Sequence, residues 1–480
     1  MNKRQVALGV FAGLAGISLI PASAGAAGAP SEAEARAAIL GWLDALASHD
    51  AATVAKVLAP EFQIMRSDGS GYDSTDYLAN LPKFNGKPEI MDLAFGGNGD
   101  DQITGIEGND ILGGDNGRIQ FDSDGVKSTI RDIISTDTSI GDDDVITAGD
   151  GFNVIIGGFG KDNITGGNGT DVVLGDNGHA IFNAAGILTY ITTICPEIGG
   201  DDVITGGDGP NVILGGFGKD KITATDGNDV ILGDNGNGTF NQTGILVYIT
   251  TTQPEIGDDD TIIAGNGNNV VLGGIGNDLI TAGNGSDYVL GDNGNATFDD
   301  TKVLLRLVTT DAAVPGTNYN DNIDVSSGDN LVMGGNGRDT IHSTTGNDII
   351  LGDNGLALFD STGGKSIIRQ LRSLDTGIGG DDGIEGGSGN NIVFGGTAKD
   401  FINVTLGNDV VAGDSAYAVF NANGIMTELT TLTPSIGDDD FITVGAGNNT
   451  VFGGTADEEE GAIEAGTDPM LAVVDATPHV

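Results

Sequence analysis

A nine-residue, glycine-rich motif repeats in tandem along most of this chain, and it limits the possible folds more than any other feature. The first copy, residues 96–104, reads GGNGDDQIT, with glycine at positions one, two and four, aspartate at position six and isoleucine at position eight. Glycine permits backbone angles that other residues resist, so six residues can turn sharply with their carbonyl groups inward, and three extended residues follow. Further copies in the same register are Gly157–Thr165, Gly215–Thr223, Gly273–Thr281 and Gly334–His342. Two motifs make one coil with a strand on each side, which predicts a mainly β, parallel solenoid.

A longer period of 58 residues lies over the nonapeptides. Asp144, Asp202 and Asp260 are equivalent and 58 residues apart, as are Asp382 and Asp440. Each unit holds four nonapeptides and then about 22 residues without the motif. We expect this spacer to form a wider coil, because residues 245–251 are long and apolar enough to join a sheet. A protruding hairpin is the alternative.

The sixth-position aspartates predict calcium sites. Alternate turns stack on the same edge of the solenoid, so backbone carbonyls and two sixth-position carboxylates would form a cage of hard oxygen ligands, which suits Ca²⁺. Turn capping is the alternative role for Asp, and it fits the Gly-Asp-Asn-Gly segments, such as that of Asp234, about as well as ligation does. The predicted ligands are Asp101, Asp110, Asp144, Asp162, Asp171, Asp202, Asp220, Asp229, Asp260, Asp278, Asp287, Asp321, Asp339, Asp348, Asp382, Asp400, Asp409 and Asp440.

The second turn of each unit differs from the others at position six, where it carries asparagine. One edge should therefore offer Asp–Asp cages and the other Asn–Asp cages. A neutral amide oxygen attracts Ca²⁺ less than a carboxylate does, so we expect the second edge to be weaker or empty. The asparagines are Asn153, Asn211, Asn269, Asn330, Asn391 and Asn449.

One of the two predicted sheets would be apolar on both faces, because the ninth position of the second and fourth turns is apolar. A strand that is apolar on both sides is typically covered twice, and a bare stripe of this size is unusual in a soluble monomer. We expect the spacers or residues 31–92 to cover it; self-association or a surface partner is the alternative. The stripe comprises Ile156, Leu174, Leu214, Leu232, Leu272, Leu290, Met333, Leu351 and Phe394.

On these motifs, residues 95–455 resemble the haemolysin-type calcium-binding (RTX) family, whose pattern is G-G-x-G-x-D-x-U-x. The resemblance implies a parallel β-roll that binds several Ca²⁺ ions. The chain has 69 acidic and 20 basic residues, a net charge of −49. Stacked acids repel one another without cations, so we expect calcium binding to be inseparable from folding. The same charge argues against nucleic acid and anionic membrane as partners.

The N-terminal region has a different composition. Lys3 and Arg4 precede an apolar run at 6–20, and Ala22-Ser23-Ala24 is a small-x-small cleavage site, so residues 1–24 are predicted to be a secretory signal peptide. This predicts a secreted or periplasmic protein without a membrane span after cleavage.

Residues 25–93 are predicted to form a small α+β domain. Ser31 and Glu34 form a capping box, and Phe62 to Met65 should be a strand. Trp42-Leu43 and the Ala59–Phe62 segment resemble the front half of the SnoaL-like (nuclear-transport-factor-2-like) fold, but no catalytic residue carries over. The β-roll should occupy 94–455 and an acidic tail 456–480.

The chain lacks His-Glu-x-x-His, Gly-x-Ser-x-Gly and phosphate-loop motifs, and its single Cys195 excludes a disulfide framework. We therefore expect a secreted calcium-binding protein with a structural or interaction role and no enzymatic activity. Two alternatives stay open: a ligand-binding or enzymatic role through residues 31–92, and a solenoid that recognises ice, a glycan or another cell.

Overall fold

The computed structural model describes residues 63–65, 71–73, 93–105, 108–122, 129–310, 319–433, 435–453, 462–465 and 472–474. This part of the chain consists of strands and turns, and it contains no helix that could cross a membrane. The chain divides into two compact units, one of residues 1–93 and 122–129 and one of 94–121 and 130–480.

In the first unit, β1 (Gln63–Met65) pairs antiparallel with β2 (Gly71–Asp73), in agreement with the strand expected at Phe62–Met65. The expected signal peptide, the capping-box region and most of the expected acidic tail lie outside the described residues. The two described stretches of that tail, Ala462–Ala465 and Ala472–Val474, pair with strands of the parallel sheets, so the roll extends beyond its expected end at residue 455.

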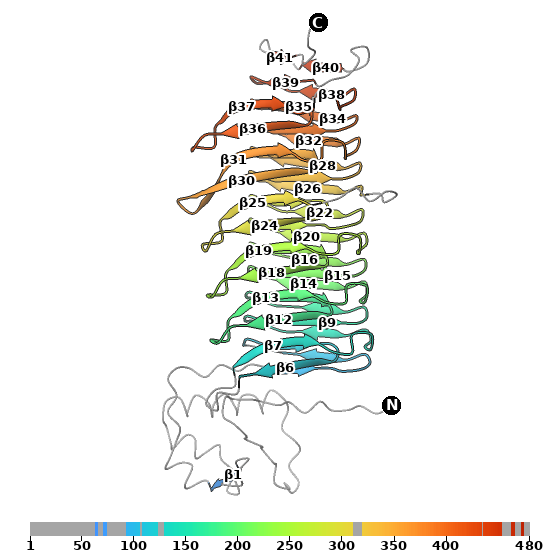
Figure 1. Cartoon of the computed structure of the whole chain (residues 1–480), viewed down its shortest axis with the longest axis vertical. Coiled ribbons are helices and arrows are strands. Elements are labelled where there is room, and N and C mark those ends of the chain that lie inside the picture. Colours follow the sequence, from blue (N-terminus) through green and yellow to red (C-terminus); the bar gives the residue numbers. More distant parts are fainter. Residues whose placement is uncertain are drawn as a thin grey trace. The chain divides into compact units, whose positions relative to one another are not determined.

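The second unit is a β-roll built from two parallel sheets and one antiparallel sheet (Figure 1). The middle sheet has fourteen strands: β3 (Leu93–Phe95), β5 (Ile111–Gly113), β9 (Val154–Gly158), β11 (Val172–Asp176), β15 (Val212–Gly216), β17 (Val230–Asp234), β21 (Val270–Leu272), β23 (Tyr288–Leu290), β27 (Leu331–Gly335), β29 (Ile349–Asp353), β33 (Ile392–Gly396), β35 (Val410–Asp414), β39 (Thr450–Phe452) and β41 (Ala472–Val474).

The outer sheet has thirteen parallel strands: β4 (Gln102–Thr104), β8 (Val145–Thr147), β10 (Asn163–Thr165), β14 (Val203–Gly207), β16 (Lys221–Ala224), β20 (Thr261–Gly265), β22 (Leu279–Ala282), β26 (Asn322–Ser327), β28 (Thr340–Thr345), β32 (Gly383–Gly387), β34 (Phe401–Val404), β38 (Phe441–Val444) and β40 (Ala462–Ala465). The chain passes from one parallel sheet to the other at each nonapeptide, so every second motif adds a strand to the same sheet.

The hairpin sheet has twelve antiparallel strands: β6 (Gly117–Phe121), β7 (Ile130–Ser135), β12 (Gly178–Phe182), β13 (Leu188–Thr193), β18 (Gly236–Phe240), β19 (Leu246–Thr251), β24 (Gly294–Phe298), β25 (Leu304–Thr309), β30 (Gly355–Thr362), β31 (Lys365–Ser373), β36 (Ala416–Phe420) and β37 (Met426–Thr431). Each spacer supplies two neighbouring strands of this sheet.

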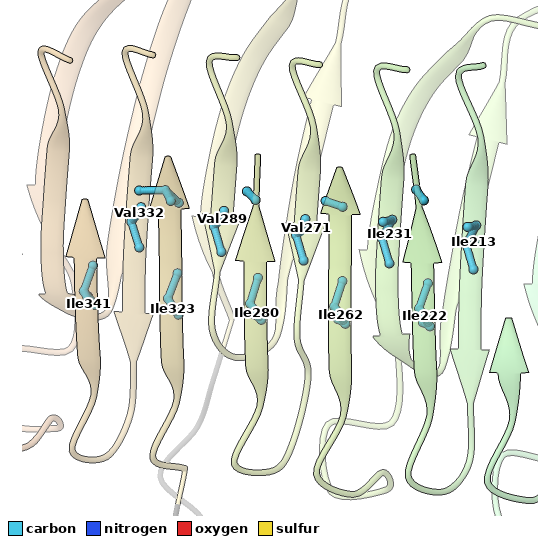
Figure 2. Packing of buried hydrophobic residues seen from close by; sticks show 14 of the residues in the cluster. Ile213, Ile222, Ile231, Ile262, Val271, Ile280, Val289, Ile323, Val332 and Ile341 are labelled. Carbon is cyan, nitrogen blue, oxygen red and sulfur yellow. The ribbon is translucent and has the colours of Figure 1, made fainter. Parts of the chain in front are cut away.

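The eighth residue of each motif forms the core between the two parallel sheets. Figure 2 shows Ile213 and Ile231 on middle-sheet strands alternating with Ile222 and Ile262 on outer-sheet strands. All four side chains are fully buried. Full burial of one such side chain contributes about 1.5–3 kcal/mol, and the repetition of this contact at every coil holds the two sheets together.

The spacers form hairpins, and the expectation of a wider coil is wrong. In the third unit, β18 and β19 are joined by residues 241–245, where the Asn241 side-chain oxygen accepts hydrogen bonds from the backbone N–H of Thr243 (2.9 Å) and Ile245 (3.1 Å). Gly244 has φ 82°, a conformation that glycine adopts without strain. These features reverse the chain, so the apolar second segment pairs antiparallel with the first.

The hairpin sheet lies flat on the outer face of the middle sheet. The nine side chains of the apolar stripe are at most 2% exposed. A Cβ on Gly236 would collide with Leu232, and one on Gly355 would collide with Leu351, so glycine lets each hairpin approach the stripe closely. The expectation that the chain covers its own stripe is confirmed, and the alternative of a self-association or partner surface through the stripe is wrong.

Neighbouring hairpins are joined by hydroxyl groups as well as by backbone pairing. Thr193 Oγ1 accepts a hydrogen bond from Gly236 N (3.2 Å), and Thr251 Oγ1 accepts one from Gly294 N (3.1 Å). Thr309 and Ser373 repeat the contact in the units that follow. Each unit is thus tied to the next through its hairpin.

Candidate metal centre

The turns of the roll form two edges. Turns that enter the outer sheet, either from the middle sheet or from a hairpin, make the Asp edge, and turns that lead from the outer sheet to the middle sheet make the Asn edge. All of the predicted ligands occupy sixth positions in these turns. The Asp edge carries Asp101, Asp144, Asp162, Asp202, Asp220, Asp260, Asp278, Asp321, Asp339, Asp382, Asp400 and Asp440. The Asn edge carries Asp110, Asp171, Asp229, Asp287, Asp348 and Asp409, which alternate with the six asparagines.

A continuous ladder of hydrogen bonds runs along the Asp edge. Asp202 N donates to Asp220 Oδ1 (2.8 Å), and Asp220 N donates to Asp260 Oδ1 (2.7 Å). The ladder uses only one oxygen of each carboxylate. The other, Oδ2, is buried and has no hydrogen-bond donor within the described part of the chain in Asp101, Asp144, Asp162, Asp202, Asp220, Asp260, Asp278, Asp339, Asp382, Asp400 and Asp440.

Each of these Oδ2 atoms packs against a glycine, at a place where any Cβ would collide with it. A Cβ on Gly215, the first residue of its turn, would collide with both Asp220 Oδ2 and the carbonyl oxygen of Gly233 in the next turn. Carboxylate and carbonyl oxygens therefore converge where no donor lies, an arrangement that fits a hard cation. The described residues contain no group of three His, Cys, Asp or Glu side chains around one metal position, so backbone carbonyls would supply much of the coordination.

Burial makes the charged form of these carboxyls costly. Burial, with the nearby Asp144 and Asp115 carboxylates, raises the pKa of Asp162 to about 8. Burial and the carboxylates of Asp176, Asp220 and Asp162 raise the pKa of Asp202 well above its ordinary value. A bound divalent cation would reverse this balance, because it favours the ionised ligands.

The Gly-Asp-Asn-Gly aspartates accept backbone hydrogen bonds as turn caps do, but Asp115 and Asp234 also keep a buried Oδ1 without a donor in the described part of the chain, so both capping and ligation stay open. Asp176 accepts hydrogen bonds from Gly200 N (3.0 Å) and Phe217 N, both in the following unit. Asp353 accepts them from Gly380 N (3.1 Å), Thr397 N and Thr397 Oγ1 (2.7 Å). Backbone amides therefore hold these carboxylates at the root of each hairpin.

The Asn edge has the same ladder with a mixed composition. Asn211 N donates to Asp229 Oδ1 (2.8 Å), while Asn211 Oδ1 accepts a hydrogen bond from Asp171 N (2.9 Å). Burial raises the pKa of Asp229 to about 6, a smaller shift than that of Asp162. The predicted division into an Asp–Asp edge and an Asn–Asp edge is confirmed as an arrangement of side chains, and its effect on calcium occupancy stays a prediction.

The comparison with protein families agrees with this geometry. The model of the RTX calcium-binding nonapeptide repeat matches residues 91–118, 140–179, 205–240, 263–298, 315–355, 376–411 and 437–457. The chain belongs to this family of calcium-binding repeat proteins, and its cofactor is Ca²⁺, bound at multiple sites. Searches of curated proteins and of solved structures return no match.

Proposed function

We propose that this chain is an exported protein with a structural or interaction role, whose roll folds when Ca²⁺ enters the Asp edge. The observation that carries the proposal is the row of buried carboxylates that each keep one oxygen facing carbonyl groups and no donor. Ionised neighbours at a strand spacing of about 4.8 Å repel one another. Calcium removes this repulsion, so binding supplies free energy of folding.

A calcium titration followed by far-UV circular dichroism tests this proposal. With calcium removed, residues 94–455 should lose strand signal, and millimolar Ca²⁺ should restore it. Magnesium should restore it poorly, because it requires a smaller and stricter octahedral site. A spectrum that is the same with and without chelator would contradict the proposal.

Export is supported by the sequence of residues 1–24, with Lys3, Arg4 and the apolar run that follows. Calcium-dependent folding also suits a protein that stays unfolded until it reaches a calcium-rich compartment. N-terminal sequencing of the protein recovered from outside the cytoplasm should begin at Gly25. Recovery with Met1 in place would contradict cleavage.

A second candidate function, recognition of a repetitive surface, is favoured by one feature of the outer sheet. Its outward face carries a row of threonines in register, one on each of five neighbouring strands: Thr104, Thr147, Thr165, Thr205 and Thr223. Such a flat, regular array suits a glycan surface with a matching repeat. The wild-type protein should then sediment together with insoluble polysaccharides, whereas the Thr165→Asp variant should stay in the supernatant. Equal sedimentation of both proteins would refute this candidate.

A ligand-binding or enzymatic role of residues 31–92 is the remaining alternative, and these residues lie almost wholly outside the described part of the chain. Deletion of 31–92 separates the possibilities. Retention of calcium binding and of all measurable function would leave the structural role, whereas loss of an activity with calcium binding intact would favour the alternative.

A further inference from the structure

The two edges differ at a second position of the motif, the first residue of each turn. On the Asp edge a glycine stands at the equivalent place after each described middle-sheet strand. It opens the nonapeptide turn at Gly96, Gly157, Gly215, Gly273, Gly334 and Gly395, and it opens the Gly-Asp-Asn or Gly-Asp-Ser segment before the hairpin at Gly114, Gly175, Gly233, Gly291, Gly352 and Gly413. On the Asn edge most turns carry a side chain there, and each is at most 2% exposed: Ala148, Ala224, Ala264, Ala282, Val325, Ser343, Val404 and Val444.

These first-position side chains stand where the oxygen atoms of the Asp edge come together. On the Asp edge, the missing Cβ of Gly215 lets Asp220 Oδ2 and the Gly233 carbonyl oxygen converge beside its Cα, where any Cβ would collide with both. At the corresponding place on the Asn edge, Ala224, Ala282 and Val404 are part of the hydrophobic core. Ser343 fills its turn with a hydroxyl, which donates to Asp348 Oδ2 (2.6 Å).

The asparagine amides satisfy the oxygen atoms that a cation would otherwise bind. Asn269 Nδ2 donates to the carbonyl of Gly265 (3.3 Å) and to Asp287 Oδ1 (3.0 Å). Asn211 Nδ2 donates to the carbonyl of Gly209 (2.8 Å). The orientation of the amide is fixed, because the other amide atom, Oδ1, accepts a backbone N–H from the preceding turn, as Asp229 N does to Asn269 Oδ1 (3.0 Å).

The turns of the Asn edge that keep glycine show where the exception lies. At Gly206 a Cβ would lie 3.1 Å from Asn211 Nδ2, and at Gly386 it would lie 2.8 Å from Val404 Cγ1, so no pair of carboxylate and carbonyl oxygens converges at either glycine. At Gly166 it would meet Asp171 Oδ2 (2.5 Å) and the carbonyl of Gly206 (2.7 Å), and at Gly105 it would meet Asp110 Oδ2 (2.3 Å) and the carbonyl of Ala148 (2.5 Å), the same pair of atoms as on the Asp edge. The Asn edge is thus closed from Asn211 onward.

We infer that the Asn edge binds no calcium from Asn211 to Asn449, because amide nitrogens, methyl groups and one hydroxyl take the place of the ion. This inference rests on the proposed loading of the Asp edge. Several carboxylates of this segment, such as Asp229 and Asp287, also have a buried Oδ2 without a donor. The absence of a glycine beside them, not the absence of a carboxylate, excludes the ion.

The test is to give one turn of the Asn edge the residues of the Asp edge. Ala264→Gly with Asn269→Asp converts the turn at 264–269 to the full glycine-and-aspartate pattern of the Asp edge. Native mass spectrometry in saturating Ca²⁺ should then show one more bound ion per chain than in the wild type. The control is Asn268→Asp, which adds the same charge at an exposed position of the same turn and should add no ion.

Calcium anomalous scattering from wild-type crystals gives a second, independent readout. Ions along the Asp edge and none beside 211–449 on the Asn edge would support the inference, even if the double variant failed to fold. Ions at both edges, or a folded double variant that gains no ion, would overturn the inference alone. A wild type that binds no calcium would overturn the proposed function instead.

Discussion

The two edges of the roll are made from one motif, yet they stabilise their stacked turns by different means. On the Asp edge, Asp220 and its neighbours keep an oxygen without a donor, and this oxygen meets a carbonyl oxygen beside a glycine. On the Asn edge, Asn211 and Asn269 provide their own donors, and alanine or valine stands in the place of that glycine. Under the inference drawn above, a sixth-position carboxylate needs a first-position glycine beside it, because the glycine lets the carboxylate and carbonyl oxygens converge. One edge would then depend on an external ion, whereas the other would supply its own hydrogen-bond donors.

Removal of calcium should give the largest difference in stability between the turns of the two edges. When Ca²⁺ is limiting, amide hydrogen exchange in the Asp-edge turn 215–220 should accelerate by at least about tenfold, which corresponds to about 1.4 kcal/mol of protection. The Asn-edge turn 206–211 should change only when the whole roll unfolds. Hydrogen exchange measured by mass spectrometry over a calcium titration resolves the two turns, and equal acceleration in both would break the comparison.

A change of pH in calcium-free solution should have the second largest effect on the stability of the roll. A carboxyl whose pKa is raised in the folded state destabilises that state when it is ionised. The destabilisation is complete above the folded pKa, and it is absent below the unfolded pKa of about 4. Burial, aided by nearby carboxylates, raises the pKa of Asp162 and Asp440 on the Asp edge to about 8, and burial raises the pKa of Asp171 on the Asn edge to about 6. The calcium-free protein should therefore regain strand signal as pH falls.

The pH profile itself distinguishes the edges. The gain should begin as pH falls through about 8, where the folded Asp edge starts to hold protons, should steepen below about 6, where the Asn edge also holds them, and should end near the unfolded value of about 4. In saturating Ca²⁺ the trend should reverse, because protons compete with the ion for the same oxygens. Circular dichroism of metal-free protein across this range checks the prediction, and a profile independent of pH would contradict it.

A matched pair of single substitutions should give effects of different size. Asp220→Asn and Asp229→Asn both keep the oxygen that accepts the backbone N–H, at 2.8 Å in each case, and both remove one charge. In saturating Ca²⁺, Asp220→Asn should lose one ion and lower the free energy of unfolding by about 1–3 kcal/mol. Asp229→Asn should change it by less than about 0.5 kcal/mol.

Calcium stoichiometry and thermal unfolding measured side by side decide this prediction. If Asp229→Asn also loses an ion, the Asn edge is a calcium edge at that turn. If neither variant loses one, the ligands of the Asp edge have been misassigned.

A change beside the Asp edge that leaves the cage intact should destabilise the roll without any effect on calcium. Thr251→Val removes the hydroxyl that accepts the N–H of Gly294, at the root of a hairpin. The expected cost is about 1 kcal/mol in the free energy of unfolding, with no change in the number of bound ions. Loss of an ion would show that hairpin docking and the calcium cage are coupled.

Much of the roll could be predicted because its signals repeat. The positions of the predicted ligands, the inward eighth residue and the covered ninth-position stripe all follow from one nine-residue register. The hairpin was kept only as the alternative to a wider coil, because the apolar run at 245–251 was weighed above the Asn-x-x-Gly turns at 183–186, 241–244 and 421–424. Those turns, placed between two extended segments, were the available signal for antiparallel pairing.

The chemistry of the edges was predicted only in part, for a physical reason. Sequence reasoning considered the ligand at position six and not the space beside it at position one. The change from Gly215 to Ala224 in successive turns is visible in the sequence. Its meaning depends on where a Cβ would point, which only the stacked coordinates reveal.

The hydroxyl contacts between hairpins have a consequence for the history of the chain. Thr193 binds the glycine amide of the next unit as Thr251 does one unit later, and the core and ladder contacts recur with the same 58-residue period. After an in-frame duplication or loss of one whole unit, the two units that become neighbours would therefore make the same strand pairing and hydroxyl contacts as before, and every strand would keep a partner. The gene can change the length of the protein in discrete steps, and each step should change its calcium capacity in proportion.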